Sequence, residues 1–271
     1  MRLIDSHCHL DFPAFDQDRA AVIAHCQTLG VEKMIVVGVT RQHWSRLWDT
    51  VSNHDGLYGA FGLHPYFLAE HQDSDIPALV EQLSLYRDHP KLCAVGEIGL
   101  DFLLQELDPK QQIHLFEQQV AIAAEFNLPV IIHSRRANAQ VTAILKKAKL
   151  PRAGIIHAFS GSYEEALEYI KLGFLLGFGG AATWPRATRL QSVLKRLPIE
   201  SIALETDSPD MPPAWLTGQR NSPEQLPHIC QHLAQLYGVS SQTFAAQTSD
   251  NVQRLFHWAT PTHNLHFKSA D

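Results

Sequence analysis

The sequence predicts a single (β/α)8 barrel. Eight short apolar or β-branched runs alternate along the 271 residues with longer amphipathic stretches. Most of these runs are apolar on both faces, as in parallel strands that are buried on both sides. The alternation continues without a change of composition or a low-complexity linker, which favours one barrel over several domains.

The predicted strands are rich in Val, Ile and Leu. They are RLIDSHC at 2–8, MIVVGV at 34–39, LYGAFGL at 57–63, CAVGEIGL at 93–100, PVIIHS at 129–134, GIIHAF at 154–159, FLLGFG at 174–179 and SIALETD at 201–207. A doubly wound open sheet is the alternative. That fold normally carries a glycine-rich phosphate loop after its first strand, and HCHLDFP at 7–13 is no such loop.

Helices are expected between the strands. The stretch 18–30 places Val22, Ile23 and Cys26 on one side and ends at Gly30, and Ser162 is the expected N-cap of another helix. The helices named from the pattern are 18–30, 108–127, 162–173, 222–238 and 241–259. We expect one barrel domain over 1–259 and a poorly structured tail over 260–271.

Composition narrows the class of protein. A hydrophobic share of 45% and a charged share of 18% are typical of a globular protein with a sizeable core. No apolar run reaches the length of about 18 residues that a membrane span needs. Asp5 and His7 stand where an export signal would be apolar, and the four cysteines have no CxxC spacing. These features predict a cytoplasmic protein with free thiols, and none indicates an obligate protein partner.

The net charge of −6 bears on possible substrates. Proteins that bind nucleic acid through many phosphate contacts are normally basic. Any nucleic-acid substrate would therefore be held locally, with help from metal charge. This balance favours single-stranded or short DNA, or a small phosphodiester, over long duplex DNA.

A His-x-His pair lies in the stretch LIDSHCHLDF at 3–12. With 16 histidines in the chain, roughly one such pair is expected by chance, so the pair alone means little. Residues i and i+2 of a strand point the same way. His7 and His9 are therefore expected to face the barrel mouth, and Cys8 to pack outward.

Further polar side chains follow the other strands. Barrel enzymes carry their chemistry at the carboxyl ends of the strands. Candidate metal ligands and proton carriers stand at these ends in six of the predicted strands: His7, His9, His64, Glu97, His133, His157 and Asp207. Each histidine alone is compatible with a structural role, but their shared position predicts a metal site. Glu205 should face the mouth together with Asp207, and one of the two is expected to cap the next helix while the other binds metal.

The ligand types limit the metal. Imidazole and carboxylate without thiolate suit Zn²⁺, Mn²⁺, Mg²⁺, Ni²⁺ or Fe²⁺. Glu97 stands in the middle of the strand order and has two oxygens, so it is the expected bridge between two ions. Paired divalent ions share a hydroxide nucleophile and clamp a phosphoryl group in many hydrolases.

Seven stretches resemble the TatD family of metal-dependent hydrolases, which have amidohydrolase-like barrels. They are DSHCHLD at 5–11, GLHP at 62–65, VGEIGLD at 95–101, LPVIIHSR at 128–135, IHAFSG at 156–161, LETDSP at 204–209 and RNSPEQLP at 220–227. Three further stretches, HSRR, GGAATWPRA and SPDMP, are most similar to the YjjV-like branch. The resemblance covers nearly the whole chain.

The resemblance implies a TIM-type barrel of the metallo-dependent hydrolase type, two divalent cations and hydrolysis of a phosphodiester, with DNase activity in several members. In this chain it places one metal on His7, His9 and Asp207 and the second on His133 and His157. Glu97 would bridge them, and His64 and Arg135 would lie near the scissile phosphate.

The predicted mechanism is hydrolytic. Asp207 accepts a proton from the attacking water, and Arg135 and His64 stabilise the charge that develops on the phosphate. His64 could instead protonate the leaving oxygen. Phe12, Tyr66, Trp184 or Trp215 could stack an unpaired base.

Two alternatives remain open on sequence grounds. The first is hydrolysis of an amide, lactone or phosphotriester by the same centre, and the second is a metal-binding scaffold without catalysis.

Overall fold

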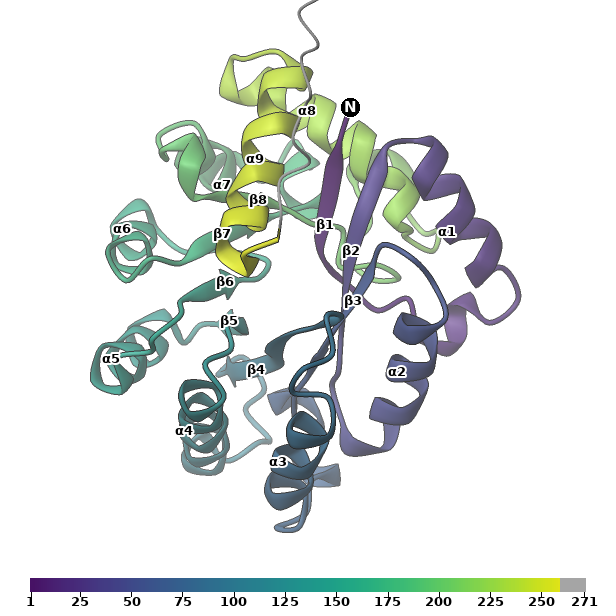
Figure 1. Ribbon diagram of the computed structural model, residues 1–271. Coiled ribbons are helices and arrows are strands. Elements are labelled where there is room, and N and C mark those ends of the chain that lie inside the picture. Colours follow the sequence, from purple (N-terminus) through teal and green to yellow (C-terminus); the bar gives the residue numbers. More distant parts are fainter. Residues whose placement is uncertain (259–271) are drawn as a thin grey trace, which may run out of the picture.

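The computed structural model describes residues 1–258, and within them the strands form one eight-stranded parallel sheet in the order of the chain. Figure 1 shows the strands surrounded by helices. The strands are β1 (Leu3–Cys8), β2 (Val31–Val37), β3 (Leu57–Phe61), β4 (Leu92–Asp101), β5 (Val130–Arg135), β6 (Gly154–Ile156), β7 (Leu175–Phe178) and β8 (Ile202–Leu204). The predicted barrel is confirmed, while the predicted boundary at 259 and the tail at 260–271 lie outside the described residues.

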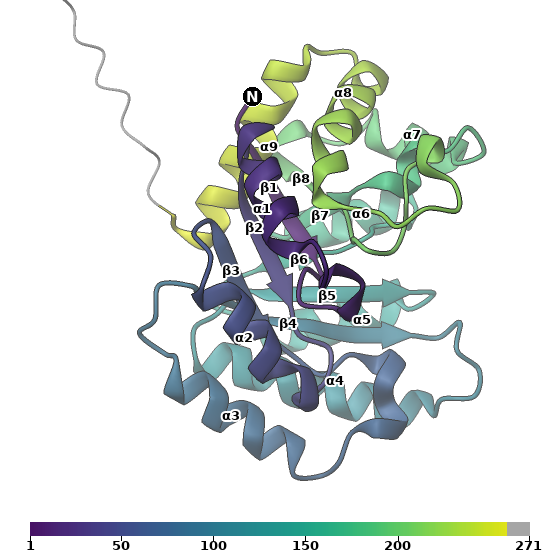
Figure 2. The same ribbon diagram turned by 90° about the vertical axis from the view of Figure 1, so that its right-hand side faces the viewer.

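Helices follow each strand and cover the outer face of the sheet (Figures 1 and 2). They are α1 (Arg19–Thr28), α2 (Trp44–Ser52), α3 (Asp75–Leu85), α4 (Pro109–Glu125), α5 (Asn138–Ala148), α6 (Tyr163–Lys171), α7 (Thr188–Leu194), α8 (Leu226–Tyr237) and α9 (Ser241–Phe256). The five helices named from the sequence are present, and the structure adds α2, α3, α5 and α7. Within residues 1–258, no helix is long and apolar enough to cross a membrane.

Backbone hydrogen bonds join the last strand to the first at the mouth. The amide of Asp207 donates to the carbonyl of His7 at 2.9 Å, and the amide of His9 donates to the carbonyl of Ser208 at 2.8 Å. The segment after β8 is thereby held beside the end of β1. This contact brings Asp207 next to the His-x-His pair, 200 positions earlier in the sequence.

Two hydrophobic clusters form the core. The larger cluster lies between the strands and the helices. It contains Cys8, whose thiol donates to the carbonyl of Ile35, and the predicted outward packing of Cys8 is confirmed. All four cysteines are buried free thiols. The smaller cluster fills the barrel interior with residues such as Ile35 and Ile131, and Val252 and Phe256 of α9 pack into it. Helix α9 therefore covers the end of the barrel opposite the mouth.

Candidate metal centre

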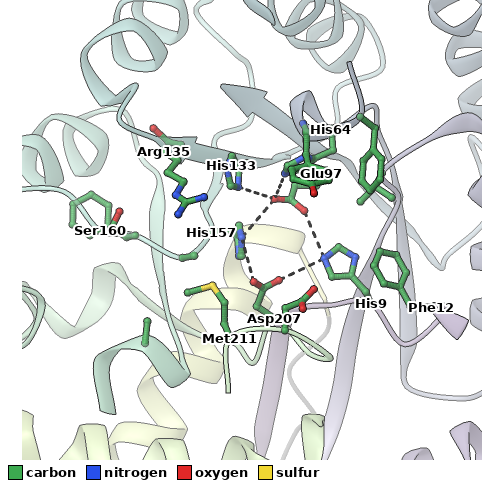
Figure 3. A pocket seen from close by; sticks show the side chains of 18 of the residues that line it. His9, Phe12, His64, Glu97, His133, Arg135, His157, Ser160, Asp207 and Met211 are labelled. Carbon is green, nitrogen blue, oxygen red and sulfur yellow. Dashed lines mark hydrogen bonds and ion pairs between the residues drawn. The ribbon is translucent and has the colours of Figure 1, made fainter. Parts of the chain in front are cut away.

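The predicted site residues meet at the carboxyl ends of the strands. A cavity of about 580 Å³ opens there, and the residues that line it include His9, His64, Glu97, His133, Arg135, His157 and Asp207. His7 lies fully buried beneath them. Figure 3 shows the imidazoles arranged around the carboxylates of Glu97 and Asp207. The structure thus brings together every residue that the sequence analysis named for the site.

One ligand group consists of His7, His9 and Asp207. The two Nε2 atoms lie 3.3 Å apart, and Asp207 Oδ1 lies 3.4 Å from that of His7 and 3.5 Å from that of His9. Two nitrogens bound to one tetrahedral ion at the usual bond length of about 2.0–2.1 Å are about 3.3–3.4 Å apart. The spacing of these imidazoles therefore fits a shared divalent cation.

Glu97 faces two sets of imidazoles with its two oxygens. Its Oε2 lies 3.3 Å from His7 Nε2 and 3.8 Å from His9 Nε2. The other oxygen, Oε1, lies 3.3 Å from His133 Nδ1 and 3.5 Å from His157 Nε2. A carboxylate whose oxygens serve different nitrogen sets has the geometry of a metal bridge.

The electrostatics of the cluster keep both central carboxylates ionised. Burial alone would raise the pKa of Glu97, but the neighbouring His64, His7 and His157 hold that pKa well below its usual value. Burial likewise opposes ionisation of Asp207, and His157, His9 and His7 outweigh it and lower its pKa. The site therefore presents two carboxylates of fixed negative charge, which attract a cation.

His157 lies among three carboxylates that raise its pKa. Its ring stacks on that of His7 with centroids 3.7 Å apart. Burial would lower its pKa, yet the charges of Asp207, Glu205 and Glu97 raise the pKa of His157 to about 10. In the metal-free protein this imidazole is protonated at neutral pH, so a cation that binds Nε2 must displace a proton.

Two carboxylates that the sequence analysis did not assign to the site stand behind the second pair of imidazoles. Asp101 Oδ2 accepts a hydrogen bond of 3.1 Å from His133 Nε2. Glu205 Oε1 lies 3.3 Å from His157 Nδ1 and accepts the amide of Ala158 at 2.6 Å. Each carboxylate leaves the opposite ring nitrogen directed at Glu97. The sequence signals for this arrangement were the motifs VGEIGLD, which contains Asp101, and LETDSP, which contains Glu205.

The expectation that Glu205 or Asp207 would cap a helix is wrong. The next helical turn, Ala214–Leu216, follows Pro213 without a side-chain cap, and Ser222 caps the turn after it. Glu205 instead lies against β7, where a Cβ on Gly177 would stand 2.1 Å from Glu205 Oε2. A glycine at position 177 is therefore needed to make room for this carboxylate.

His64 is buried against the bridging carboxylate of Glu97. Its Nε2 is 3.0 Å from Glu97 Oε1, and its Nδ1 accepts the amide of Tyr66 at 3.0 Å. Burial lowers the pKa of His64 to about 4. A neutral imidazole whose Nδ1 accepts a hydrogen bond carries its proton on Nε2. His64 therefore donates to Glu97, although its position would also allow it to join a ligand group with Glu97 and His133.

Arg135 lies on the rim. Its side chain is 54% exposed, and its Nη1 is 3.8 Å from Asp101 Oδ2. Figure 3 places Arg135 on one side of the cluster and Phe12 on the other. Among the aromatic residues considered for base stacking, Phe12 and Tyr66 line the cavity, whereas Trp184 and Trp215 do not.

Comparison with known proteins identifies the family of this chain. A profile of the TatD-related DNase family matches residues 4–257. The metal-dependent hydrolase YjjV of Escherichia coli is 39% identical over 94% of this chain and 98% of its own. The 3′-5′ ssDNA/RNA exonuclease TatD of Klebsiella pneumoniae is 33% identical over 94% of this chain and 97% of its own.

Among solved structures, Escherichia coli YjjV superposes with a TM-score of 0.91 at 38% identity, covering 95% of this chain and 99% of that one. The chain belongs to the TatD-related DNase family and is a metal-dependent hydrolase.

Proposed function

We propose that this protein hydrolyses phosphodiester bonds in single-stranded or short nucleic acid with a centre of two divalent cations. The observation that carries the proposal is Glu97, whose two oxygens face separate imidazole sets at 3.3–3.8 Å. The Klebsiella pneumoniae relative, TatD, is a 3′-5′ exonuclease on single-stranded DNA and RNA. The net charge of −6 also favours a substrate that is held at few phosphates.

The residues would divide between two cations. His7, His9 and Asp207 would hold one, His133 and His157 the other, and Glu97 would bridge them. Bound divalent cations supply Lewis acidity, which lowers the pKa of water and neutralises charge on a phosphoryl group. Nitrogen and carboxylate ligands suit Zn²⁺, Mn²⁺, Ni²⁺ or Mg²⁺. We place the enzyme in the cytoplasm because its four cysteines are free.

Asp207 would accept the proton of the attacking water. Its lowered pKa keeps it ionised at neutral pH, as a base must be. Asp207 lines the cavity and its side chain is 14% exposed, so a water molecule held in the cavity can reach it. Replacing Asp207 with Asn removes the charge and keeps the shape.

Arg135 would bind the phosphate of the substrate, whereas His64 would hold the carboxylate of Glu97. Arg135 is an exposed guanidinium on the cavity wall, suited to a phosphate oxygen. His64 is neutral and donates to Glu97, so we assign it to holding the bridging carboxylate. This assignment replaces protonation of the leaving oxygen, because the Nε2 proton is already engaged.

The experiment that tests the function is metal removal and return. The protein is stripped with a chelator and assayed on a single-stranded oligonucleotide and on a simple phosphodiester after addition of Mg²⁺, Mn²⁺, Zn²⁺ or Ni²⁺. We expect cleavage of the oligonucleotide only with metal. Cleavage of cyclic amides, lactones or phosphotriesters in place of both phosphodiesters would overturn the proposal, and so would the absence of any metal-dependent turnover.

Matched variants make that test specific. Asp207→Asn should lower kcat by about 10²–10⁴-fold, the usual contribution of a positioned base. Glu168→Gln alters an exposed carboxylate on α6, paired with Lys146 and Lys171, and should leave kcat unchanged. Equal rates for the Asp207→Asn variant and the parent protein would remove Asp207 from the reaction.

A further inference from the structure

We infer that the mouth cavity contains a nucleobase subsite, formed by an aromatic wall of Phe12, Tyr66 and Phe67. This inference rests on the proposed function and adds a binding site for the base of a nucleotide beside the scissile phosphate. All three rings line the same cavity as the ligand cluster. Figure 3 shows Phe12 beyond His9 and Arg135 across Glu97.

The wall is continuous with the imidazoles. The Phe12 ring stacks on His9 with centroids 4.6 Å apart, and the Phe67 ring meets His64 edge to face at 6.3 Å. Tyr66 meets Phe67 edge to face at 5.1 Å. The rings therefore begin at a proposed metal ligand, His9, and at His64, which contacts Glu97, and they line the cavity beside the place where a phosphate would be held.

Tyr66 is the outermost ring and is 60% exposed. Five large hydrophobic side chains are exposed by 39–70% within residues 1–258, and two of them, Tyr66 and Met211, line this cavity. Scattered exposed apolar residues need no explanation, but their concentration at one concave site marks a ligand surface. Phe12 and Phe67 are only half-buried and add to the same surface.

The backbone holds Tyr66 in a fixed place relative to the cluster. Its amide donates to Nδ1 of His64 at 3.0 Å, and His71 Nε2 donates to the His64 carbonyl at 2.9 Å. Pro65 lies between His64 and Tyr66 in the chain and begins the short helix Pro65–Glu70. The backbone of Tyr66 is therefore hydrogen-bonded to His64, the imidazole that contacts Glu97.

The occupant we assign is a single unpaired base. A nucleotide joins an anionic phosphate to an aromatic ring. The cavity offers both a cationic side chain, Arg135, and aromatic faces, with Phe12 across the cluster from Arg135. Stacking on an aromatic side chain contributes about 1–3 kcal/mol per base and tolerates any base. It supplies affinity that a protein of net charge −6 does not gain from many phosphate contacts.

The test compares oligonucleotides with and without bases. Substrates are a thymidine tetranucleotide and a tetramer of abasic deoxyribose with the same backbone, and the proteins are the parent, Tyr66→Ala, Tyr66→Phe and Trp215→Ala. Trp215 is 45% exposed and lies outside the cavity, so it is the matched control. We expect the parent to favour the thymidine substrate about 5- to 150-fold in kcat/KM, the equivalent of about 1–3 kcal/mol.

Tyr66→Ala should lose that preference by slowing only the thymidine substrate, while Tyr66→Phe and Trp215→Ala should retain it. Equal preference in Tyr66→Ala and parent, or equal slowing on both substrates, would overturn the subsite. Binding of both tetramers is measured in parallel by fluorescence anisotropy in chelator, where nothing is cut. If no protein cleaves either tetramer with any metal, the proposed function fails. A base-dependent affinity that Tyr66→Ala abolishes would still support the subsite, and base-independent affinity would overturn it.

Discussion

Carboxylates placed behind two imidazoles organise the site at the level of single residues. Asp101 holds His133 through Nε2 at 3.1 Å, and Glu205 faces His157 Nδ1 at 3.3 Å. Such partners orient a ligand and set which nitrogen is free for a metal. His7 and His9 have no corresponding partner on their buried Nδ1 atoms within residues 1–258. The imidazoles on the two sides of Glu97 are therefore supported differently.

Glu205→Gln should weaken metal binding by about 10- to 100-fold, because the neutral amide no longer favours a proton on His157 Nδ1. Titration calorimetry with Zn²⁺ or Mn²⁺ measures the affinity directly. Glu168→Gln, an exposed carboxylate on α6, should leave it unchanged. An unaltered affinity in Glu205→Gln, with the fold intact by circular dichroism, would show that this carboxylate does not support a ligand.

Among the elements, α9 closes the barrel and α6 shows how local sequence sets a helix start. Val252 and Phe256 of α9 enter the cluster inside the barrel, at the end opposite the mouth. Ser162 accepts the amide of Glu165 at 3.2 Å, and Glu165 accepts the amide of Ser162 at 2.6 Å, which forms a capping box. The predicted cap is confirmed.

Phe256→Ala should destabilise the protein by about 3–5 kcal/mol, the usual loss for a buried aromatic, because it opens a cavity under the strands. Equilibrium unfolding in urea measures the change. The ligands lie at the other end of the barrel, so metal affinity should stay the same under native conditions. A loss below about 1 kcal/mol would mean that α9 contributes little to the closed barrel.

Ser162→Ala removes half of the capping box and should lower the free energy of unfolding by about 1 kcal/mol. Ser162→Asp should retain most of the stability, since Asp also accepts at an N-cap. Thermal unfolding of the three proteins compares them. A Ser162→Ala protein as stable as the parent would indicate that solvent replaces the cap without loss.

For the whole molecule, the buried charges of the centre link stability to metal and to pH. The proposed ligands are four imidazoles and two carboxylates at the floor of the mouth cavity. They come together only in the folded chain, so cations bind the folded state. A ligand that binds the folded state alone stabilises it, by about 2.7 kcal/mol at a hundredfold excess over its dissociation constant. We expect a chelator to lower the melting temperature, and saturating Zn²⁺ or Mn²⁺ to restore it. A melting temperature that changes with neither the chelator nor the added metal would contradict an assembled metal site.

The metal-free protein should lose stability as the pH rises from about 7 to 10. The folded pKa of His157 is raised to about 10, above the ordinary value of 6.5. Its contribution is complete below 6.5 and disappears as the pH rises through about 10. Asp5, whose pKa burial raises to about 7, acts below this window. His157→Gln should flatten the decline measured by thermal unfolding in chelator, and an equal decline in both proteins would assign it to other groups.

Much of this architecture could be read from the order of residues. Apolar runs on both faces predict buried parallel strands, and the polar residues that end them predict a shared rim. The period of two places His7 and His9 on one face and Cys8 on the other, as observed. These features depend on local alternation and on the rule that parallel strands end at the same edge.

Other features depend on contacts across the barrel. That Asp101 and Glu205 support imidazoles, that His64 donates to Glu97, and that Tyr66 lines the cavity while Trp215 does not, follow from distances between elements far apart in sequence. Strand periodicity decides which face a side chain takes, but not which partner it meets there. Partner choice is set by the register of neighbouring strands, as where β4 lies beside β5 and brings Asp101 to His133, and by the closure of the sheet, which brings the segment after β8 against β1.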